Sequence, residues 1–507
     1  MAEAHDWSKA GRLSPVSMLF RLIPILKGLA FPAIAIFVAG GGDFSFGIWS
    51  GSAVLIMGLA FGVALVVETV RYLTVRYTFG EAELVVRQGI FSKNERHIPL
   101  ARVQNVDQLQ NPLHRMLKVA EVRLQTASGA EPEAVFRVLS LESLDRLREG
   151  INRGKPAGEA AADTDAAGRQ ANEREILALG PLEFIRLGII SNRGVLVVAA
   201  TLGFFWQFVF DEEAFFGRVR AQVESLPIPA LGPELMGVIV FASILLAGLS
   251  LVALSVLWTT SRFYGFRLTR IGDGFRIQCG LLTKRTANVP AGRIQFVSIH
   301  QSPLARNMGR ATIRVETAGG VGEQDEMNFG RKWFVPIIDV ARLREVVQEI
   351  QSGLDLVRID WSPLPKRARR RMMVKASIVW IAIGGALAAL IWPWGLFALV
   401  LLPAFAAFIA AQAYRFMAVA QTPTHLLFRS GLLTRRTSAV QIDKIQSVDL
   451  NESPFDRRHG HRSLSIDTAG AGPAGHKISI PYLDRDRAVD LAEELTRRAE
   501  RAGFTWT

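Results

Sequence analysis

The sequence contains one cysteine, Cys279, so neither an intramolecular disulfide nor a Cys-x-x-Cys metal site can form. Motifs of catalysis and cofactor binding are also missing, among them the Walker loop, the His-Glu-x-x-His zinc motif, the Gly-x-Ser-x-Gly elbow and the EF-hand loop. Two glycine-rich stretches, 318–326 and 469–477, do not open a helix, which favours hairpin loops over a phosphate cradle. We therefore expect a protein that is not an enzyme and that holds no metal or cofactor.

Charged residues are almost absent from six apolar runs of 17 to 22 residues, with Lys27 near one end as the exception. A helix needs about 20 residues to cross the hydrocarbon core of a bilayer, and the shorter runs can borrow flanking residues. Because no run carries a line of Asp, Glu or His, transport through these segments alone is not favoured. We predict six spans in three pairs, at 24–40 with 47–67, 194–210 with 236–257, and 376–392 with 395–413.

The excess of positive charge, +13 in total, is concentrated beside the spans. Segment 366–375 (KRARRRMMVK) carries six cations, whereas the loop at 41–46 has no Lys or Arg. The positive-inside rule then places both termini and the long segments that follow each pair in the cytoplasm. The same charge attracts anionic phospholipid, and no nucleic-acid partner is expected. Residues 1–19 lack the pattern of a signal peptide and are interpreted as a cytoplasmic tail.

One segment occurs three times, as GIFSKNE (89–95), GLLTKRT (280–286) and GLLTRRT (431–437). The stretches that follow align without a gap for nearly forty residues, with Gln, Pro and Thr at 15, 23 and 37 residues after the first Gly. Each copy follows a pair of spans, so the repeating unit is two spans plus one domain. The signature residues are Gly89, Gln104, Pro112 and Thr126; Gly280, Gln295, Pro303 and Thr317; and Gly431, Gln446, Pro454 and Thr468.

Each copy reads as antiparallel strands followed by one helix. Turn residues such as Gly80, Gly89 and the Gly-Asp-Gly at 272–274 separate strand-like runs. The segments EVRLQTA, TIRVETA and SLSIDTA alternate with period two, which is typical of a strand with one buried face. Apolar stripes predict a closing amphipathic helix in each copy: Leu141, Leu144, Leu147 and Ile151; Val340, Leu343, Val347 and Ile350; and Ala488, Leu491, Leu495 and Ala499. The pattern predicts an α+β unit.

This pattern resembles the bacterial pleckstrin-homology-like (PH-like) domain, and the whole chain resembles the YdbT-like membrane proteins. The resemblance rests on the G-[IL]-[FL]-[ST]-[KR] hairpin, the [RK]-[VI]-Q-x-V segment at 102–106, 293–297 and 444–448, the proline that follows it and the Thr-Ala at the strand end. It implies three transmembrane α-hairpins alternating with three α+β PH-like domains, each a bent antiparallel sheet with a C-terminal helix. It also implies a bacterial cytoplasmic (inner) membrane location and brings no catalytic residues.

Composition and the repeat together predict the boundaries of the units. The linker at 152–180 is expected to be disordered, because it is rich in Ala, Gly and charge and has no apolar period. The expected units are a cytoplasmic tail at 1–19; transmembrane hairpins at 20–70, 181–260 and 372–413; PH-like domains at 71–151, 261–353 and 414–507; and a basic linker at 354–371.

Basic residues at the tip of the first hairpin of each copy are the candidate sites of contact with anionic lipid or a partner. In PH domains generally, this hairpin can meet lipid headgroups, and each cation near an anionic leaflet contributes about 1 kcal/mol. The competing interpretation is a solvated turn, because two cations per tip fall short of the roughly four to eight of a typical lipid-binding cluster. The candidates are Lys93, Arg96, Lys284, Arg285, Arg435 and Arg436.

The paired histidines His459 and His461 have no evident third ligand, so we expect a solvated loop there. The resulting hypothesis is a non-enzymatic, membrane-anchored scaffold that binds an unknown protein partner through its PH-like domains and contacts lipid. An exposed sheet edge offers one route, because a partner can add a strand to it. The alternative is a subunit or regulator of a lipid- or peptide-handling transport system.

Overall fold

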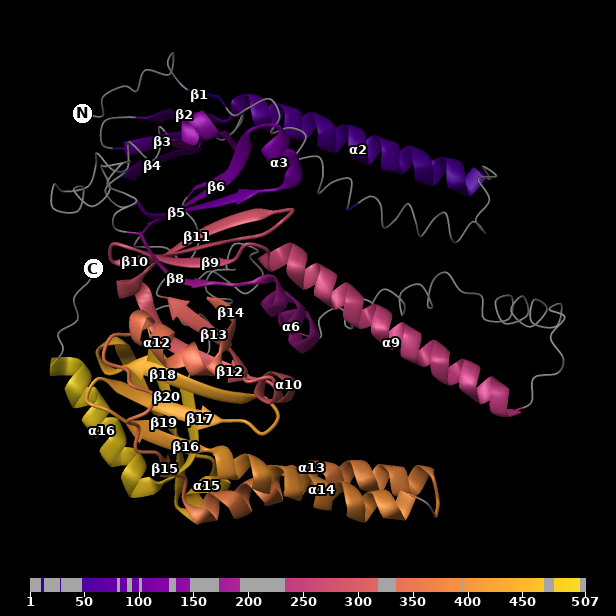
Figure 1. The fold of residues 1–507 in the computed structure, drawn as a ribbon, viewed down its shortest axis with the longest axis vertical. Helices are drawn as coiled ribbons and strands as arrows, with labels where there is room; N and C mark the ends of the chain where they lie inside the picture. Colours follow the sequence, from indigo (N-terminus) through magenta and orange to yellow (C-terminus); the bar gives the residue numbers. More distant parts are fainter. Residues whose placement is uncertain are drawn as a thin grey trace.

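The computed structural model describes residues 11–12, 28, 48–79, 83–88, 94–99, 103–126, 134–145, 173–191, 233–317, 334–393, 395–468 and 478–501. Apart from residue 28, the spans expected at 24–40 and 194–210 lie outside these residues, as does residue 93. The described residues form three sheet-rich domains that are stacked along one axis, with long helices leaving the stack on one side (Figure 1).

The long helices coincide with the other expected spans. They are α2 (Ile48–Thr74), α9 (Pro233–Phe263), α13 (Lys366–Leu390) and α14 (Gly395–Phe416). Among the described residues, three helical segments are long and apolar enough to cross a membrane, namely Phe241–Phe263, Lys366–Leu390 and Gly395–Phe416. The cations of 366–371 form the first turns of α13, so this helix begins ten residues before the expected span at 376–392.

Domain 1 consists of two sheets. Its elements are β2 (Arg76–Phe79), β3 (Glu83–Gln88), β4 (Asn94–Pro99), β5 (Val103–Gln110), α3 (Pro112–Met116), β6 (Val119–Thr126) and β7 (Ala134–Ser140). Strands β2, β3 and β4 pair in sequence order in the first sheet, and β5, β6 and β7 pair in the second. The chain is helical at 141–145, where Leu144 is buried as expected, and the rest of the expected closing helix lies outside the described residues.

Domains 2 and 3 repeat this order. Domain 2 contains β9 (Arg267–Ile271), β10 (Gly274–Cys279), β11 (Lys284–Pro290), β12 (Ile294–Gln301), α10 (Pro303–Asn307), β13 (Arg310–Thr317), β14 (Val335–Asp339) and α12 (Val340–Ile350). Domain 3 contains β16 (Ala418–Gln421), β17 (His425–Ser430), β18 (Arg435–Gln441), β19 (Ile445–Asn451), α15 (Pro454–His459), β20 (His461–Thr468), β21 (Ile478–Asp484) and α16 (Arg485–Arg501). The expected α+β architecture is confirmed.

A strand that precedes each expected span pair in the sequence joins the sheet that follows the pair. These strands are β1 (Gly11–Arg12), β8 (Glu173–Ala178) and β15 (Ser362–Pro363), which pair with β2, β9 and β16. The end of the segment expected to be a disordered linker is therefore a strand, because Ile176 and Leu177 are buried in the core of domain 2. The strands on either side of each expected span pair thus belong to the same sheet.

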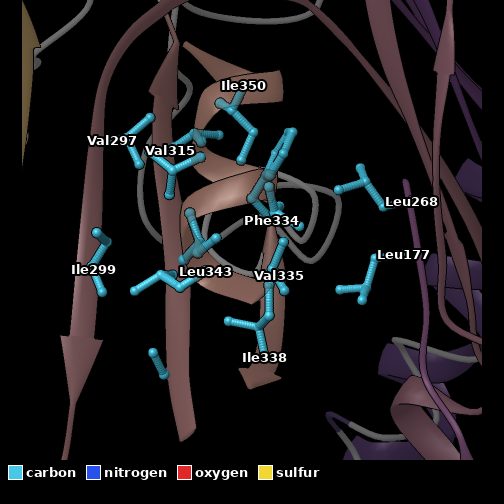
Figure 2. Close-up of a cluster of buried hydrophobic side chains, with 14 of the residues drawn as sticks. Leu177, Leu268, Val297, Ile299, Val315, Phe334, Val335, Ile338, Leu343 and Ile350 are labelled. Atoms are coloured by element: carbon cyan, nitrogen blue, oxygen red, sulfur yellow. The ribbon is translucent and has the colours of Figure 1, made fainter. Parts of the chain in front are cut away.

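The core of domain 2 lies between its sheets and its closing helix. Figure 2 shows Leu177 beside Leu268, with Phe334, Val335 at the start of β14, and Leu343 and Ile350 of α12 nearby. Among the expected stripe residues of α12, Leu343, Val347 and Ile350 are buried, whereas Val340 in the first turn is exposed. In α16 the buried residues are Ala488, Leu491, Ala492 and Leu495.

Candidate functional site

The domains are joined by strand pairing. The second sheet of each domain continues into the first sheet of the next, giving the strand orders β7-β6-β5-β11-β10-β9-β8 and β14-β13-β12-β18-β17-β16-β15. At the first junction Lys284 pairs with Gln110, and at the second Arg435 pairs with Gln301. Lys284 and Arg435 each lie four residues after the repeat glycine of their own copy. Their partners, Gln110 and Gln301, each lie 21 residues after the repeat glycine of the preceding copy. The two junctions therefore share one register.

Apolar packing crosses the second junction as well. The buried cluster of domain 2 includes Ala420, Leu427 and Ala439 of domain 3, and the cluster of domain 3 includes Phe296 of domain 2. Six consecutive residue pairs join β12 to β18. Backbone pairing together with a shared core favours one rigid body over domains that move independently.

The hairpin tips that carry the repeated segment lie at the ends of the long helices. The backbone N–H of Gly280 donates to the carbonyl of Tyr264 at 2.8 Å, and that of Leu281 donates to Ser261 at the end of α9 at 2.9 Å. In domain 3 the guanidinium of Arg435 lies 4.6 Å from the ring centre of Phe416, the last residue of α14. Each of these two tips therefore lies where a candidate span meets its domain.

An arginine of the preceding domain holds each of these tips. Arg115 on α3 donates to the carbonyl of Leu281 at 3.2 Å. Arg306 on α10 donates to the carbonyls of Leu432 and Leu433 at 3.1 and 3.0 Å. Both arginines lie 26 residues after their repeat glycine, where domain 3 has Arg457. This position was not among the sequence candidates, although an arginine three residues after each repeat proline was a signal for it.

The sequence candidates divide between the two junctions and the first domain. Lys284 and Arg285 pair with β5, and Lys284 is exposed. At the second junction Arg436 pairs with His300 of β12, and its burial lowers the pKa of the guanidinium against the opposing effect of Glu316. Arg96 is exposed on β4, and residue 93 lies outside the described part of the chain. The structure thus brings four of the cations against the neighbouring domain.

The repeat signature has a structural role at each position that the structure describes. The strand register shifts on either side of Gln104, Gln295 and Gln446, so the repeated glutamine is the extra residue of a β-bulge. The repeated proline opens each short helix, where its missing N–H leaves no helical hydrogen bond unmade. The repeated threonine pairs at the end of the strand: Thr126 with Val103, Thr317 with Ile294 and Thr468 with Ile445.

The histidine pair is a structural feature of domain 3. His459 ends α15, Gly460 takes a positive φ of 69°, and His461 is buried at the start of β20 with its ring 6.3 Å from that of Tyr482. The expectation of a solvated loop was therefore wrong for His461, because the strand that follows the turn enters the core. No group of three His, Cys, Asp or Glu suited to a metal occurs in the described part of the chain.

A cleft of about 950 Å³ lies between the end of domain 2 and domain 3. Buried His425 lines it together with Asp443, Glu494 and Arg498. Burial lowers the pKa of the His425 imidazole, so the ring is neutral near neutral pH. The lining carries both signs of charge and does not point to one class of ligand.

An ion-pair network ties helix α6 to domain 2. The guanidinium of Arg310 contacts Glu183 of α6 (Pro181–Ser191) through two bonds of 2.9 Å, and Asp339 at 2.6 Å. Burial alone would raise the pKa of Glu183, but hydrogen bonds from Arg310 and Arg186 hold it below its ordinary value. Helix α6 then packs on α9, where a Cβ at Gly188 would lie 2.5 Å from the Cα of Val256.

The profile of the bacterial PH domain matches residues 24–155, 221–353 and 374–499. The chain belongs to the bacterial PH domain family. It is 22% identical over 463 residues to the UPF0699 transmembrane protein YdbT of Bacillus subtilis (strain 168), which covers 89% of this chain and 91% of YdbT. It is 34% identical over 88 residues to the UPF0699 transmembrane protein YdbS of the same organism, which covers 17% of this chain and 54% of YdbS. No solved structure matches.

These comparisons confirm the resemblance to YdbT-like membrane proteins. The chain is a membrane protein with three bacterial PH domains, each matched together with an adjoining apolar segment. Membrane embedding brings the chain into contact with lipid.

Proposed function

We propose that this protein is a non-enzymatic, membrane-anchored scaffold. The observation that carries the proposal is the strand pairing at the junctions, which has the same register in both and joins three PH domains into one platform. A platform that is fixed to long helices at several points presents partners in a constant arrangement. The alternative, a regulator of a lipid- or peptide-handling transporter, requires domains that move relative to one another when the transporter changes state.

Spin labels across the second junction distinguish these two functions. Glu345 of α12 and Asp490 of α16 are exposed, and we expect the Glu345→Cys, Asp490→Cys variant to give one narrow distance distribution in nanodiscs. Native Cys279 does not interfere, because burial raises the pKa of its thiol to about 12. The matched control is Glu345→Cys with Asp273→Cys, where both residues are exposed within domain 2. An inter-domain distribution much broader than this control would contradict the scaffold and favour the regulator.

We also propose that the domains lie in the cytoplasm of a bacterial inner membrane. The domain ends of the long helices carry cations: Arg71 of α2, Arg262 of α9, Arg367 of α13 and Arg415 of α14. The positive-inside rule assigns such ends to the cytoplasm. The exposed leucines at the tips, Leu282 and Leu433, then face the membrane surface near the helix ends.

Cysteine labelling tests orientation and lipid contact together. A membrane-impermeant maleimide should label Glu345→Cys in inside-out vesicles but not in intact cells. In proteoliposomes, Leu282→Cys at the tip should react more slowly with anionic than with neutral lipid, by roughly fivefold for one cation. The added substitution Lys284→Ala should remove that difference, because Lys284 is the exposed cation of this tip.

Glu345→Cys is the matched control for lipid effects, since it lies on the closing helix away from the tip. Labelling of Glu345→Cys in intact cells would overturn the orientation. Equal rates for Leu282→Cys in the two lipids would leave the tip as a junction element without a role in lipid contact.

A further inference from the structure

Two strands, one in the first domain and one in the last, are edges in the described sheets. Strand β4 of domain 1 ends the order β1-β2-β3-β4, and β19 of domain 3 ends the order β19-β20-β21. In the repeat, β4 corresponds to β11 and β18, and β19 corresponds to β5 and β12. The junctions inside the chain pair these two kinds of strand. Among the described strands, the first and the last domain therefore each have one strand of a junction kind with a single strand partner.

Among the described residues, β19 has no strand partner on one side, although helix α16 packs beside it. Residues 294–299 of β12 are all buried, because β13 and β18 flank that strand. In β19 the corresponding face is open, and Gln446, Ser447, Asp449, Leu450 and Asn451 are exposed. Natural edge strands are commonly protected by lysine, proline or a covering element. The sequence of β19, IQSVDLN, contains neither lysine nor proline, and five of its seven residues stay exposed although α16 packs beside the strand.

The shared register predicts how β19 would pair with β4 of a second copy. In the second junction Ser298 pairs with Ser438, which lie 18 and 7 residues after their repeat glycines. The corresponding residues of the two edge strands are Asp449 and Arg96, both of which are exposed. The register of the internal junction thus places an acid opposite a base, which is a favourable cross-strand pair.

Arg457 occupies the position of the two tip-holding arginines. It lies on α15 as Arg306 lies on α10, and its side chain is exposed. No hydrogen bond or ion pair of that side chain is found within the part of the chain that the structure describes. Arg457 therefore has the sequence position of a junction arginine and no side-chain partner among the described residues.

The membrane permits this arrangement. Helices α2, α9, α13 and α14 leave the stack on one side, although they belong to successive repeats (Figure 1). The placement of each domain relative to the preceding one therefore keeps the long helices directed toward the same side. A further copy that is added in the same placement has its own helices directed toward the same membrane.

We propose that β19 of one copy pairs with β4 of a second copy, so that the protein assembles head to tail in the membrane. The contact is heterologous, because different surfaces of the two copies meet, and it repeats until a ring closes or an open row forms. The proposal extends the scaffold function by making the platform longer than one chain.

Disulfide crosslinking of two differently tagged full-length copies in native membranes tests this contact. One copy carries Asp449→Cys and the other carries Arg96→Cys. We expect a disulfide-linked heterodimer when both are expressed together. The matched control replaces Asp449→Cys with Leu450→Cys, whose side chain points to the opposite face of the strand. The positive control is Ser298→Cys with Ser438→Cys in one chain, where the two residues pair across the internal junction.

The outcomes separate clearly. A heterodimer with Asp449→Cys but not with Leu450→Cys supports the proposal, and Asp449→Arg should then reduce assembly several-fold until Arg96→Asp in the other copy restores it. No heterodimer, or equal yields with both variants, would overturn it when the internal control forms its disulfide. A link from Asp449→Cys to a different protein alone would also overturn it. Narrow spin-label distances without a heterodimer would leave the scaffold intact and refute only the assembly.

Discussion

Replacing Gly280 with alanine is expected to destabilise domain 2 by about 3 kcal/mol and to detach β11 from β5. Gly280 has a φ of 108°, a conformation that residues with a Cβ rarely adopt, and a Cβ there would overlap the carbonyl oxygen of Thr283. The turn cannot shift freely, because the N–H of Gly280 is bound to Tyr264 and the next residue is held by Arg115. The strain therefore reaches the junction and the end of α9.

Hydrogen exchange in nanodiscs measures this effect locally. The amides of β11 that face β5 should lose protection by about two orders of magnitude, which corresponds to about 3 kcal/mol. The matched control is Gly292→Ala, because Gly292 follows the same strand and a Cβ there meets nothing within 4 Å. Unchanged protection of β11 in Gly280→Ala would show that the tip does not control the junction.

Replacing Arg310 with methionine is expected to destabilise the chain by about 2 kcal/mol. Its side chain is only 12% exposed, and its loss leaves Glu183 partly buried without its main partner. The expected loss of stability is smaller than for a fully buried ion pair, because Asp339 is 44% exposed. The substitution should also loosen α6, which packs on α9, from domain 2. Pulse proteolysis in urea on the full chain in detergent measures the change.

Two controls make the Arg310 result specific. Arg344→Met should cost less than about 0.5 kcal/mol, since Arg344 is 51% exposed and pairs with Asp355 at the surface. A double-mutant cycle with Glu183→Gln should show that the two substitutions are not additive. Additive effects would contradict direct coupling between α6 and domain 2.

The pH dependence of this pair follows from the direction of the shift. The pKa of Glu183 in the folded chain lies below its ordinary value of 4.5, so the unfolded chain binds the proton first. The pair therefore contributes its full stability above about pH 4.5 and loses it as the pH falls through the lowered pKa. The difference between the wild type and Arg310→Met should shrink in that range and stay constant from pH 6 to pH 8.

Much of the candidate site was present in the sequence as spacing. The repeated glycine, proline and glutamine could be read without a structure, and each has a local backbone role as turn, helix start or bulge. The arginine at Arg115, Arg306 and Arg457 could have been found in the same way. Arg310 could not be found from the repeat, because Val119 and His461 occupy the corresponding positions in the other copies. Its partner Glu183 lies before α9 in the sequence, 127 residues away.

The amino-acid sequence by itself determined the three units, the apolar helices and the alternation of strands, since these depend on local periodicity and on residues with special backbone freedom. Only the tertiary structure decided which strands meet. Backbone hydrogen bonds between strands do not depend on side-chain identity. The sequences of β11 and β18 alone therefore do not predict that these strands pair with β5 and β12. For the same reason the sequence did not predict strand β8, which lies at the end of an Ala- and Gly-rich linker and pairs with β9. The basic tips therefore read as free surface in the sequence and lie at domain junctions in the fold.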